Sequence, residues 1–332
     1  MTRQVITETV TAKEADTRLD RWVKRRMPMT QGELEKLLRS GQIRVDGARA
    51  KANLRLQAGM VVRLPPFKTK ASSGDEPWSA PSKPNAKALA YLKPLIIHED
   101  EDMFALNKPA GIAVQGGTGQ GGRHIDGMLD ALSDGEHRPK LVHRLDKETS
   151  GLLLIARHPA AAARLGELFK GRDMDKVYWA VTVGVPNPPV GQLRSWMRKG
   201  TKPEDRERMV LGAHGDRASK HAVTDYAVVT TAAQRAAWVA LKPQTGRTHQ
   251  LRFHMHELGV SILGDDKYQT RREVPGGVGL GLHLHARALV IPRKHGKPLT
   301  LQAPLSGTMK TTFEAMGFLE SEAGRDPLEL FV

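Results

Sequence analysis

The chain has 332 residues, a formal net charge of +15 and no cysteine, which excludes disulfide bonds, a thiol nucleophile and cysteine-based zinc sites. No apolar run approaches the roughly 20 residues of a membrane span, so we expect a cytoplasmic protein with no membrane partner. The positive charge favours a polyanionic partner, with nucleic acid ahead of a membrane surface.

Residues 1–64 are predicted to form a small α/β unit that is rich in positive charge. They contain four Lys and ten Arg against seven Asp and Glu, an excess of seven positive charges. Apolar residues at helical spacing predict one helix around 19–23 and a second helix after a capping box at Thr30–Glu33. An Asp46-Gly47 turn predicts a hairpin, and residues 60–62 predict a further strand.

Several basic side chains of this unit lie off the apolar faces: Lys36, Arg39, Arg44 and Arg49. They form either an ordinary solvated surface or a phosphate-binding patch, and their density favours the patch. The segments SGQIRVDGARAK (40–51) and LQAGMVVRL (56–64) resemble the S4-type RNA-binding domain over residues 16–64. The stretch MTQGELEKLL (29–38) departs from that family, which often opens this helix with Ser-Arg.

The rest of the chain is predicted to be a linker followed by a larger domain. Residues 65–93 contain five Pro and no periodic pattern, which is typical of a tether. From residue 94 to 332, many short apolar runs and few helical patterns predict an α+β domain with a mixed or antiparallel sheet. Helices are expected at 160–169 and 124–132, and strands at 95–97, 104–106, 152–155, 177–183, 227–230, 238–241 and 288–291. The Gly-rich stretch 116–122 lacks the Lys-Ser/Thr ending of a phosphate-binding P-loop, so we exclude nucleotide binding there.

A charged segment, VHRLDKETSG (142–151), directly precedes the apolar run GLLLIA (151–156). Asp146 therefore falls in a loop between two predicted strands, where catalytic groups commonly lie. The same position also suits three roles without chemistry: Asp146 could cap a turn, pair with an arginine such as Arg144, or be a surface charge.

A second charged segment, PQTGRTHQLRFHMHELG (243–259), contains Arg247 and Arg252 together with histidines at 249, 254 and 256. The arginines would repel a cation and no carboxylate completes a known spacing, so we predict no metal site. We expect the histidines to make structural hydrogen bonds. Arginine grips carboxylates and phosphates, so the two arginines are candidates to hold Asp146 ionised or to bind RNA phosphates.

Five segments together resemble the RluA-type pseudouridine synthases, in particular the RluC/RluD branch, which has an N-terminal S4 domain. They are NKPAG (107–111), HRLDKETSG (143–151), KVYWA (176–180), TGRTHQLRFH (245–254) and ILGDDKY (262–268). The resemblance implies that Asp146 is the essential aspartate, that Arg247 pairs with it and that Tyr178 packs against the target base. It also implies that Arg144 fills the gap left by an extruded nucleotide, and that Lys108 with Pro109 is structural. We add His143 and Arg252 as candidate substrate-binding residues.

The expected function is the isomerisation of uridine to pseudouridine in RNA, by resemblance the large-subunit (23S) ribosomal RNA. The reaction has no net redox change, so we expect no cofactor, and we expect a monomer. The target base must leave its stack to be reached. The sequence leaves open whether the aspartate attacks C1′, attacks C6 or removes a sugar proton. Two rival functions are a non-catalytic RNA-binding or ribosome-assembly protein and a metal-dependent hydrolase built on the 249–256 histidines.

Overall fold

The computed structural model describes residues 5–27, 29, 31–66, 85–116, 124–171, 173–205, 207–293 and 295–331. The chain divides into two compact units, Met1–Pro77 and Trp78–Val332, and each is described by itself. Among the described residues, no helix combines the length and apolar character needed to cross a bilayer.

The N-terminal unit packs two helices on a small antiparallel sheet. The sheet has the strand order β1 (Ile6–Thr9), β4 (Val61–Leu64), β2 (Arg44–Val45) and β3 (Ala48–Arg49). The helices are α1 (Leu19–Arg26) and α2 (Gln31–Arg39), with a 3₁₀ turn, η1, at Ala12–Glu14.

Both expected helices and the expected hairpin of this unit are present. Leu19, Trp22 and Leu34 are fully buried in its core. Asp46 and Gly47 both have positive φ in the turn between β2 and β3, as a tight hairpin requires. The predicted capping box begins at Thr30, which lies outside the described residues.

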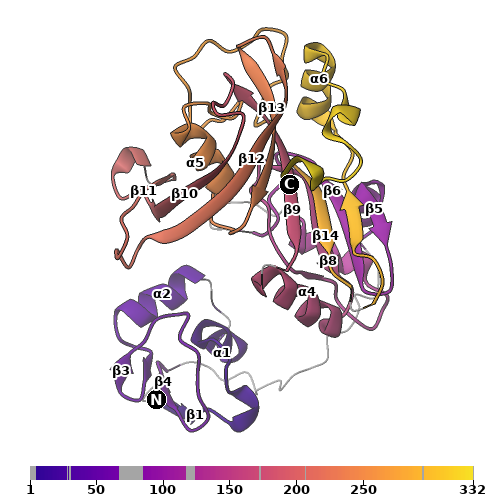
Figure 1. The fold of residues 1–332 in the computed structure, drawn as a ribbon. Helices are drawn as coiled ribbons and strands as arrows, with labels where there is room; N and C mark the ends of the chain where they lie inside the picture. The colour runs from indigo at the N-terminus through magenta and orange to yellow at the C-terminus, as the bar shows by residue number, and fades with distance from the viewer. Residues whose placement is uncertain are drawn as a thin grey trace. The chain divides into compact units, whose positions relative to one another are not determined.

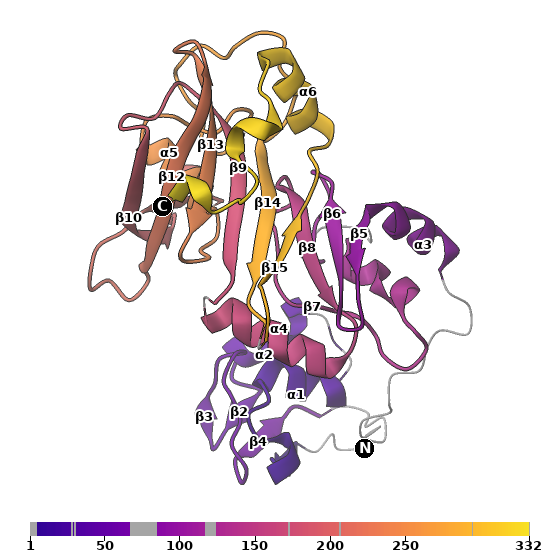
Figure 2. The same cartoon turned by 45° about the vertical axis from the view of Figure 1, so that its right-hand side comes forward.

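The larger unit is built on an 11-stranded sheet (Figure 1, Figure 2). The main path runs β11-β10-β12-β13-β9-β14-β8-β6-β5, with β15 paired to β14 and β7 paired to β8. All of these pairs are antiparallel except β14 with β8. The strands are β5 (Ile96–Glu99), β6 (Met103–Lys108), β7 (Lys140–Leu141), β8 (Ser150–Ala156), β9 (Asp175–Val183), β10 (Val190–Lys199), β11 (Met209–Leu211), β12 (Lys220–Ala232), β13 (Ala236–Pro243), β14 (Leu284–Ile291) and β15 (Leu299–Gln302). The expected mixed α+β architecture is therefore confirmed.

Helices cover both faces of this sheet because side chains alternate along each strand. Trp179 of β9 packs with α6 (Gly307–Met316), where its ring lies 6.0 Å from that of Phe313. The next residue, Ala180, belongs to the cluster that includes Leu251 and Met255 of α5 (Gln250–Glu257). α4 (Pro159–Gly171) buries Leu165 in a third cluster with β8 and β6. Four 3₁₀ turns also belong to the sheet unit: η2 (Lys93–Leu95), η4 (Pro203–Asp205), η5 (Glu320–Ala323) and η6 (Glu329–Phe331).

Two segments differ from expectation. The end of the predicted linker forms α3 (Ala86–Leu92), because the Asn85 side chain accepts a hydrogen bond from the Ala88 N–H at 3.1 Å and Leu92 is fully buried. The predicted helix at 124–132 is a 3₁₀ segment, η3 (Asp126–Leu132). Residues 67–84 of the linker and 117–122 of the Gly-rich stretch lie outside the described residues.

Candidate active site

Two loops of the sheet unit meet at a pocket of about 250 Å³. The first loop joins β7 to β8 and carries Asp146, and the second joins β13 to α5. The pocket is lined by Arg144, Leu145, Asp146, Thr149, Lys176, Tyr178, Pro243, Thr245, Gly246, Arg247, Thr248, His249, Gln250, Leu251, Arg252 and Leu284. The fold thus brings together the two charged segments, 142–151 and 243–259, although they lie far apart along the chain.

Lys108 anchors the loop that carries Asp146. Its side chain is fully buried, and Nζ donates hydrogen bonds to the carbonyl oxygens of Pro109 (2.8 Å), Ile112 (3.0 Å) and Lys147 (3.0 Å). Burial lowers the pKa of Lys108 to about 8, against the opposing charges of Glu148 and Asp146. At neutral pH the ammonium group is therefore charged and holds the backbone beside Asp146, in agreement with the predicted structural role.

His143 lies in the same loop, and its side chain contacts β8 and α4. Its Nε2 accepts a hydrogen bond from the Leu154 N–H at 2.9 Å, and its ring stacks on Phe169 with 4.3 Å between centroids. Burial, followed by the charge of Lys176, lowers the pKa of His143 to about 3, so the imidazole is neutral. His143 does not line the pocket. Its acceptor nitrogen is used within the sheet, and the expected contact with substrate stays a prediction.

Gly151 allows β8 to approach β14 closely. Its φ is +103°, and a Cβ there would lie 2.6 Å from the Ala286 nitrogen and closer still to the Ala286 carbonyl oxygen. Beside it, Ser150 Oγ lies 2.9 Å from Nδ1 of the buried His285. This contact fixes the one parallel pair of the described sheet, and with it the end of the strand that Asp146 precedes.

Arg252 lies in the first turn of α5, directly after the second loop, and two ion pairs hold its side chain in place. The guanidinium is 3% exposed and makes a two-point ion pair with Asp265 (2.7 and 2.6 Å), and it also reaches Asp266 at 2.8 Å. Burial alone would lower the pKa of Arg252, but Asp265, and more weakly Asp146, raise it. Two carboxylates of the chain already pair with this arginine, and the expected contact with RNA stays a prediction.

Arg247 lies in the pocket wall without pairing with Asp146. Its Nε donates to the carbonyl oxygen of His221 in β12 at 3.1 Å. Over the part of the chain that the structure describes, no ion pair joins Arg247 to Asp146, in contrast to the expected pairing. Asp146 contributes to raising the pKa of Arg252. Both arginines still contribute positive charge to the pocket.

Tyr178 and Arg144 also line the pocket. Tyr178 projects from β9, in register with Leu241 and Ala286 on the neighbouring strands. Burial, and then the charge of Asp146, raise the pKa of Tyr178 well above its usual value, so the phenol stays protonated. Arg144 is exposed and precedes Asp146 by two residues in the pocket wall.

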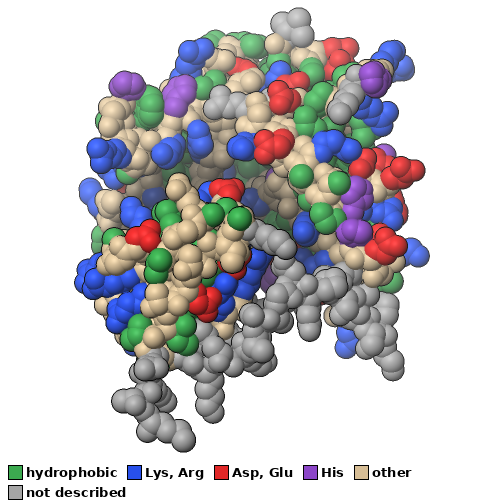
Figure 3. All heavy atoms as spheres, turned by 90° about the horizontal axis from the view of Figure 1, so that it is seen from below, with side chains coloured by type: hydrophobic (Ala, Val, Ile, Leu, Met, Phe, Trp, Pro, Cys, Tyr) green, Lys and Arg blue, Asp and Glu red, His purple; other side chains and the backbone are tan. Residues whose placement is uncertain are grey.

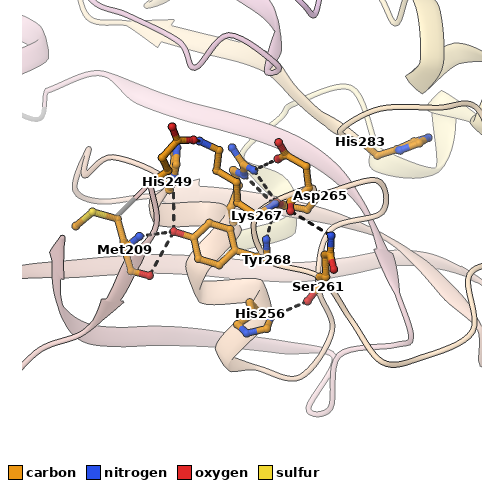
Figure 4. A network of polar contacts seen from close by, with 12 residues as sticks. Met209, His249, His256, Ser261, Asp265, Lys267, Tyr268 and His283 are labelled. Carbon is orange, nitrogen blue, oxygen red and sulfur yellow. Dashed lines mark hydrogen bonds and ion pairs between the residues drawn. The ribbon is translucent and has the colours of Figure 1, made fainter. Parts of the chain in front are cut away.

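The three histidines of the second segment do not converge. His254 is buried between Ser195 Oγ and Thr224 Oγ1, each at 2.8 Å, and burial lowers its pKa to about 4. His256 contacts Ser261 Oγ at 2.9 Å (Figure 4). Within the described residues, no three His, Asp or Glu side chains are arranged to hold a metal ion.

Two ionisable residues of the pocket wall, Lys176 and His249, were not predicted as site residues from the sequence. Lys176 belongs to the KVYWA segment two residues before Tyr178, so strand alternation places both side chains on one face of β9. His249 was expected to be a structural histidine, and no local pattern indicated that it would reach the pocket.

The S4-like unit keeps its candidate residues at the surface. Lys36 and Arg39 are exposed in the last turn of α2. Arg44 is partly ordered by its own hairpin, where it donates to the carbonyl oxygens of Gly41 and Gly47, each at 3.1 Å.

Comparison with known proteins identifies both units. Residues 102–257 match the family model described as RNA pseudouridylate synthase, and residues 17–62 match the S4 domain. The chain is 36% identical over 301 residues to Ribosomal large subunit pseudouridine synthase C of Rickettsia felis, covering 87% of this chain and 93% of the relative. It is 33% identical over 314 residues to the protein of that name from Escherichia coli K12, covering 92% and 95%.

A solved structure supports the same assignment. Human RNA Pseudouridylate Synthase Domain Containing 4 superposes with a TM-score of 0.58 and 30% identity, covering 70% of this chain and 97% of that one. The family expected from the five segments and the expected S4 domain are thus both confirmed. The chain belongs to the RNA pseudouridylate synthases and carries an S4 domain at its N-terminal end.

Proposed function

We propose that this protein converts specific uridines of large-subunit (23S) ribosomal RNA into pseudouridine. The names of the two bacterial relatives support this substrate, and so does the S4 unit. The net charge of +15 suits a polyanion, and Lys and Arg side chains are spread over the face in Figure 3.

The observation that carries the proposal is the position of Asp146 in the pocket. Its carboxylate shares the pocket with Arg247 and Arg252, two cations that attract a negative charge. The reaction breaks the bond between N1 and C1′, turns the base and joins C5 to C1′. A carboxylate can start this sequence, and because the reaction has no net redox change or hydrolysis, we expect no cofactor.

Tyr178 and Arg144 are assigned to the bound nucleotide. Flipping a base costs a few kcal/mol, and less in a loop or bulge. Stacking on an aromatic ring returns about 1–3 kcal/mol, the role we assign to Tyr178. The exposed Arg144 is assigned to the gap in the RNA. Lys36 and Arg39 of α2 are assigned to RNA phosphates. The monomeric state and the cytoplasmic location of the protein stay predictions.

The test uses a strain in which the Asp146→Asn variant is the only copy of this protein in the cell. We expect pseudouridine to disappear from the ribosomal RNA positions that the wild type modifies, as read by site-resolved chemical mapping. Glu148→Gln is the matched control, because it removes one negative charge from the same loop at a residue outside the pocket wall. It should leave the modified positions unchanged.

The mapping also separates the rival function. A non-catalytic assembly protein would support growth equally well as wild type or Asp146→Asn, and the modified positions would be the same in both strains. Full pseudouridine in the Asp146→Asn strain would overturn the proposal.

A further inference from the structure

His249 holds an unusual backbone conformation at the pocket wall. Its φ and ψ are +52° and +20°, the left-handed region that non-glycine residues rarely adopt. Such conformations persist only where the surrounding structure enforces them, and they cluster at functional sites. His249 directly precedes α5 and lines the pocket.

The side chain of Gln250 enforces this conformation. Its Oε1 accepts from Thr245 Oγ1 at 2.7 Å and from the Arg247 N–H at 3.0 Å. Its Nε2 donates to the carbonyl oxygen of Val223 and to Thr224 Oγ1, each at 2.9 Å. Gln250 is buried and fully hydrogen-bonded, and thereby ties the loop that precedes His249 to β12.

The contacts of Tyr268 select one tautomer of His249 (Figure 4). The Tyr268 hydroxyl accepts from the Met209 N–H at 2.7 Å, donates to the Met209 carbonyl oxygen at 3.4 Å and lies 3.3 Å from His249 Nδ1. When the hydroxyl proton is directed at the Met209 carbonyl oxygen, the hydroxyl oxygen accepts from Nδ1–H of His249. All three contacts are then satisfied, and Nε2 keeps its lone pair.

Burial favours the neutral form of this imidazole. Burial lowers the pKa of His249, and Arg252 and Lys267 lower it further, while Asp146 and Asp265 oppose them. Among the described residues, Nε2 has no hydrogen-bond partner. A neutral imidazole with a free lone pair is a general base.

Apart from Asp146, the other ionisable groups of the pocket wall are poor proton acceptors. Arg144, Arg247, Arg252 and Lys176 are cations. Tyr178 stays protonated because its pKa is raised. Asp146, the remaining ionisable group of the wall, is assigned to the start of the reaction under the proposed function.

We propose that Nε2 of His249 removes the proton from C5 of the rearranged base, an inference that rests on the proposed function. After C5 has bonded to C1′, C5 still carries its hydrogen. When His249 takes that proton, the C5–H electron pair forms the C5–C6 double bond. The electrons of the C6–N1 double bond then move to N1, which takes a proton from water. His249 returns its own proton to solvent, so the reaction remains an isomerisation.

The test compares His249→Asn with wild type on large-subunit ribosomal RNA transcribed with hydrogen or deuterium at uridine C5. Asparagine tolerates the left-handed backbone and keeps a donor near the Nδ1 position, but it has no imidazole Nε2. We expect the rate of pseudouridine formation to fall by about 10²-fold to 10⁴-fold. We also expect deuterium to slow the variant more than the wild type, and added imidazole to restore part of the rate.

His256→Asn is the matched control, because it makes the same change near the far end of α5, outside the pocket wall. It should behave as the wild type does with both RNAs. His249→Asn at the wild-type rate, or slowed without any added deuterium effect or imidazole rescue, would show that His249 only shapes the pocket. Wild-type protein that forms no pseudouridine would instead overturn the proposed function, and the inference with it.

Discussion

Gly151→Ala should destabilise the sheet unit through two separate effects. A Cβ at φ +103° is strained, which costs about 1–2 kcal/mol on the scale of left-handed backbone for L-residues. The same Cβ would also lie 2.6 Å from the Ala286 nitrogen, so β8 and β14 must move apart. Overpacking of this kind adds about 1–3 kcal/mol. The total expected loss in the free energy of unfolding is about 2–5 kcal/mol.

Gly135→Ala separates the two effects. Its φ is +96°, but nothing lies within 4 Å of a Cβ there, so only the backbone strain applies. Urea unfolding of the two variants and the wild type gives both free-energy losses, and activity on RNA reports the shift of the Asp146 loop. Equal losses for Gly135→Ala and Gly151→Ala would refute the close approach of the two strands.

Three further outcomes follow from the site. Arg252→Gln should lower the free energy of unfolding by about 3–5 kcal/mol, because it leaves the buried carboxylate of Asp265 unpaired. Arg247→Gln should lower activity on RNA but cause little loss of stability in the same urea titration. The pKa of His143 is about 3 when folded against its usual 6.5, so the unfolded chain binds the extra proton and stability falls as pH drops below 6.5. Between pH 6.5 and 4, wild type should lose about 3 kcal/mol more than His143→Gln in urea titrations at each pH. Replacing Lys36 and Arg39 by Gln should reduce the slope of log K against log[salt] by about 0.7–0.9 for each phosphate that the variant no longer neutralises, as measured by RNA binding over a salt series.

Much of the fold could be predicted from the apolar runs. Strands at 104–106, 152–155 and 177–183 lie within β6, β8 and β9, because each run is buried in the sheet. β10 was not predicted. Only Met197 of that strand is fully buried, and its other residues are exposed or half-buried. The strand therefore lacks the continuous apolar run that indicated β6, β8 and β9. Its strand conformation comes from pairing with β12 over eight residues, a long-range contact that no local pattern contains.

The sequence by itself determined the chemistry that is available: a basic N-terminal unit, Asp146 in a loop before a buried strand, and two arginines in a second charged segment. It did so because residue types and their spacing carry charge and periodicity directly. Only the tertiary structure decided which arginine is locked by Asp265, that Lys108 anchors the Asp146 loop, and that His249 lines the pocket. Those outcomes depend on burial and on hydrogen bonds between segments far apart in the chain, where chemically equivalent side chains compete for the same partner.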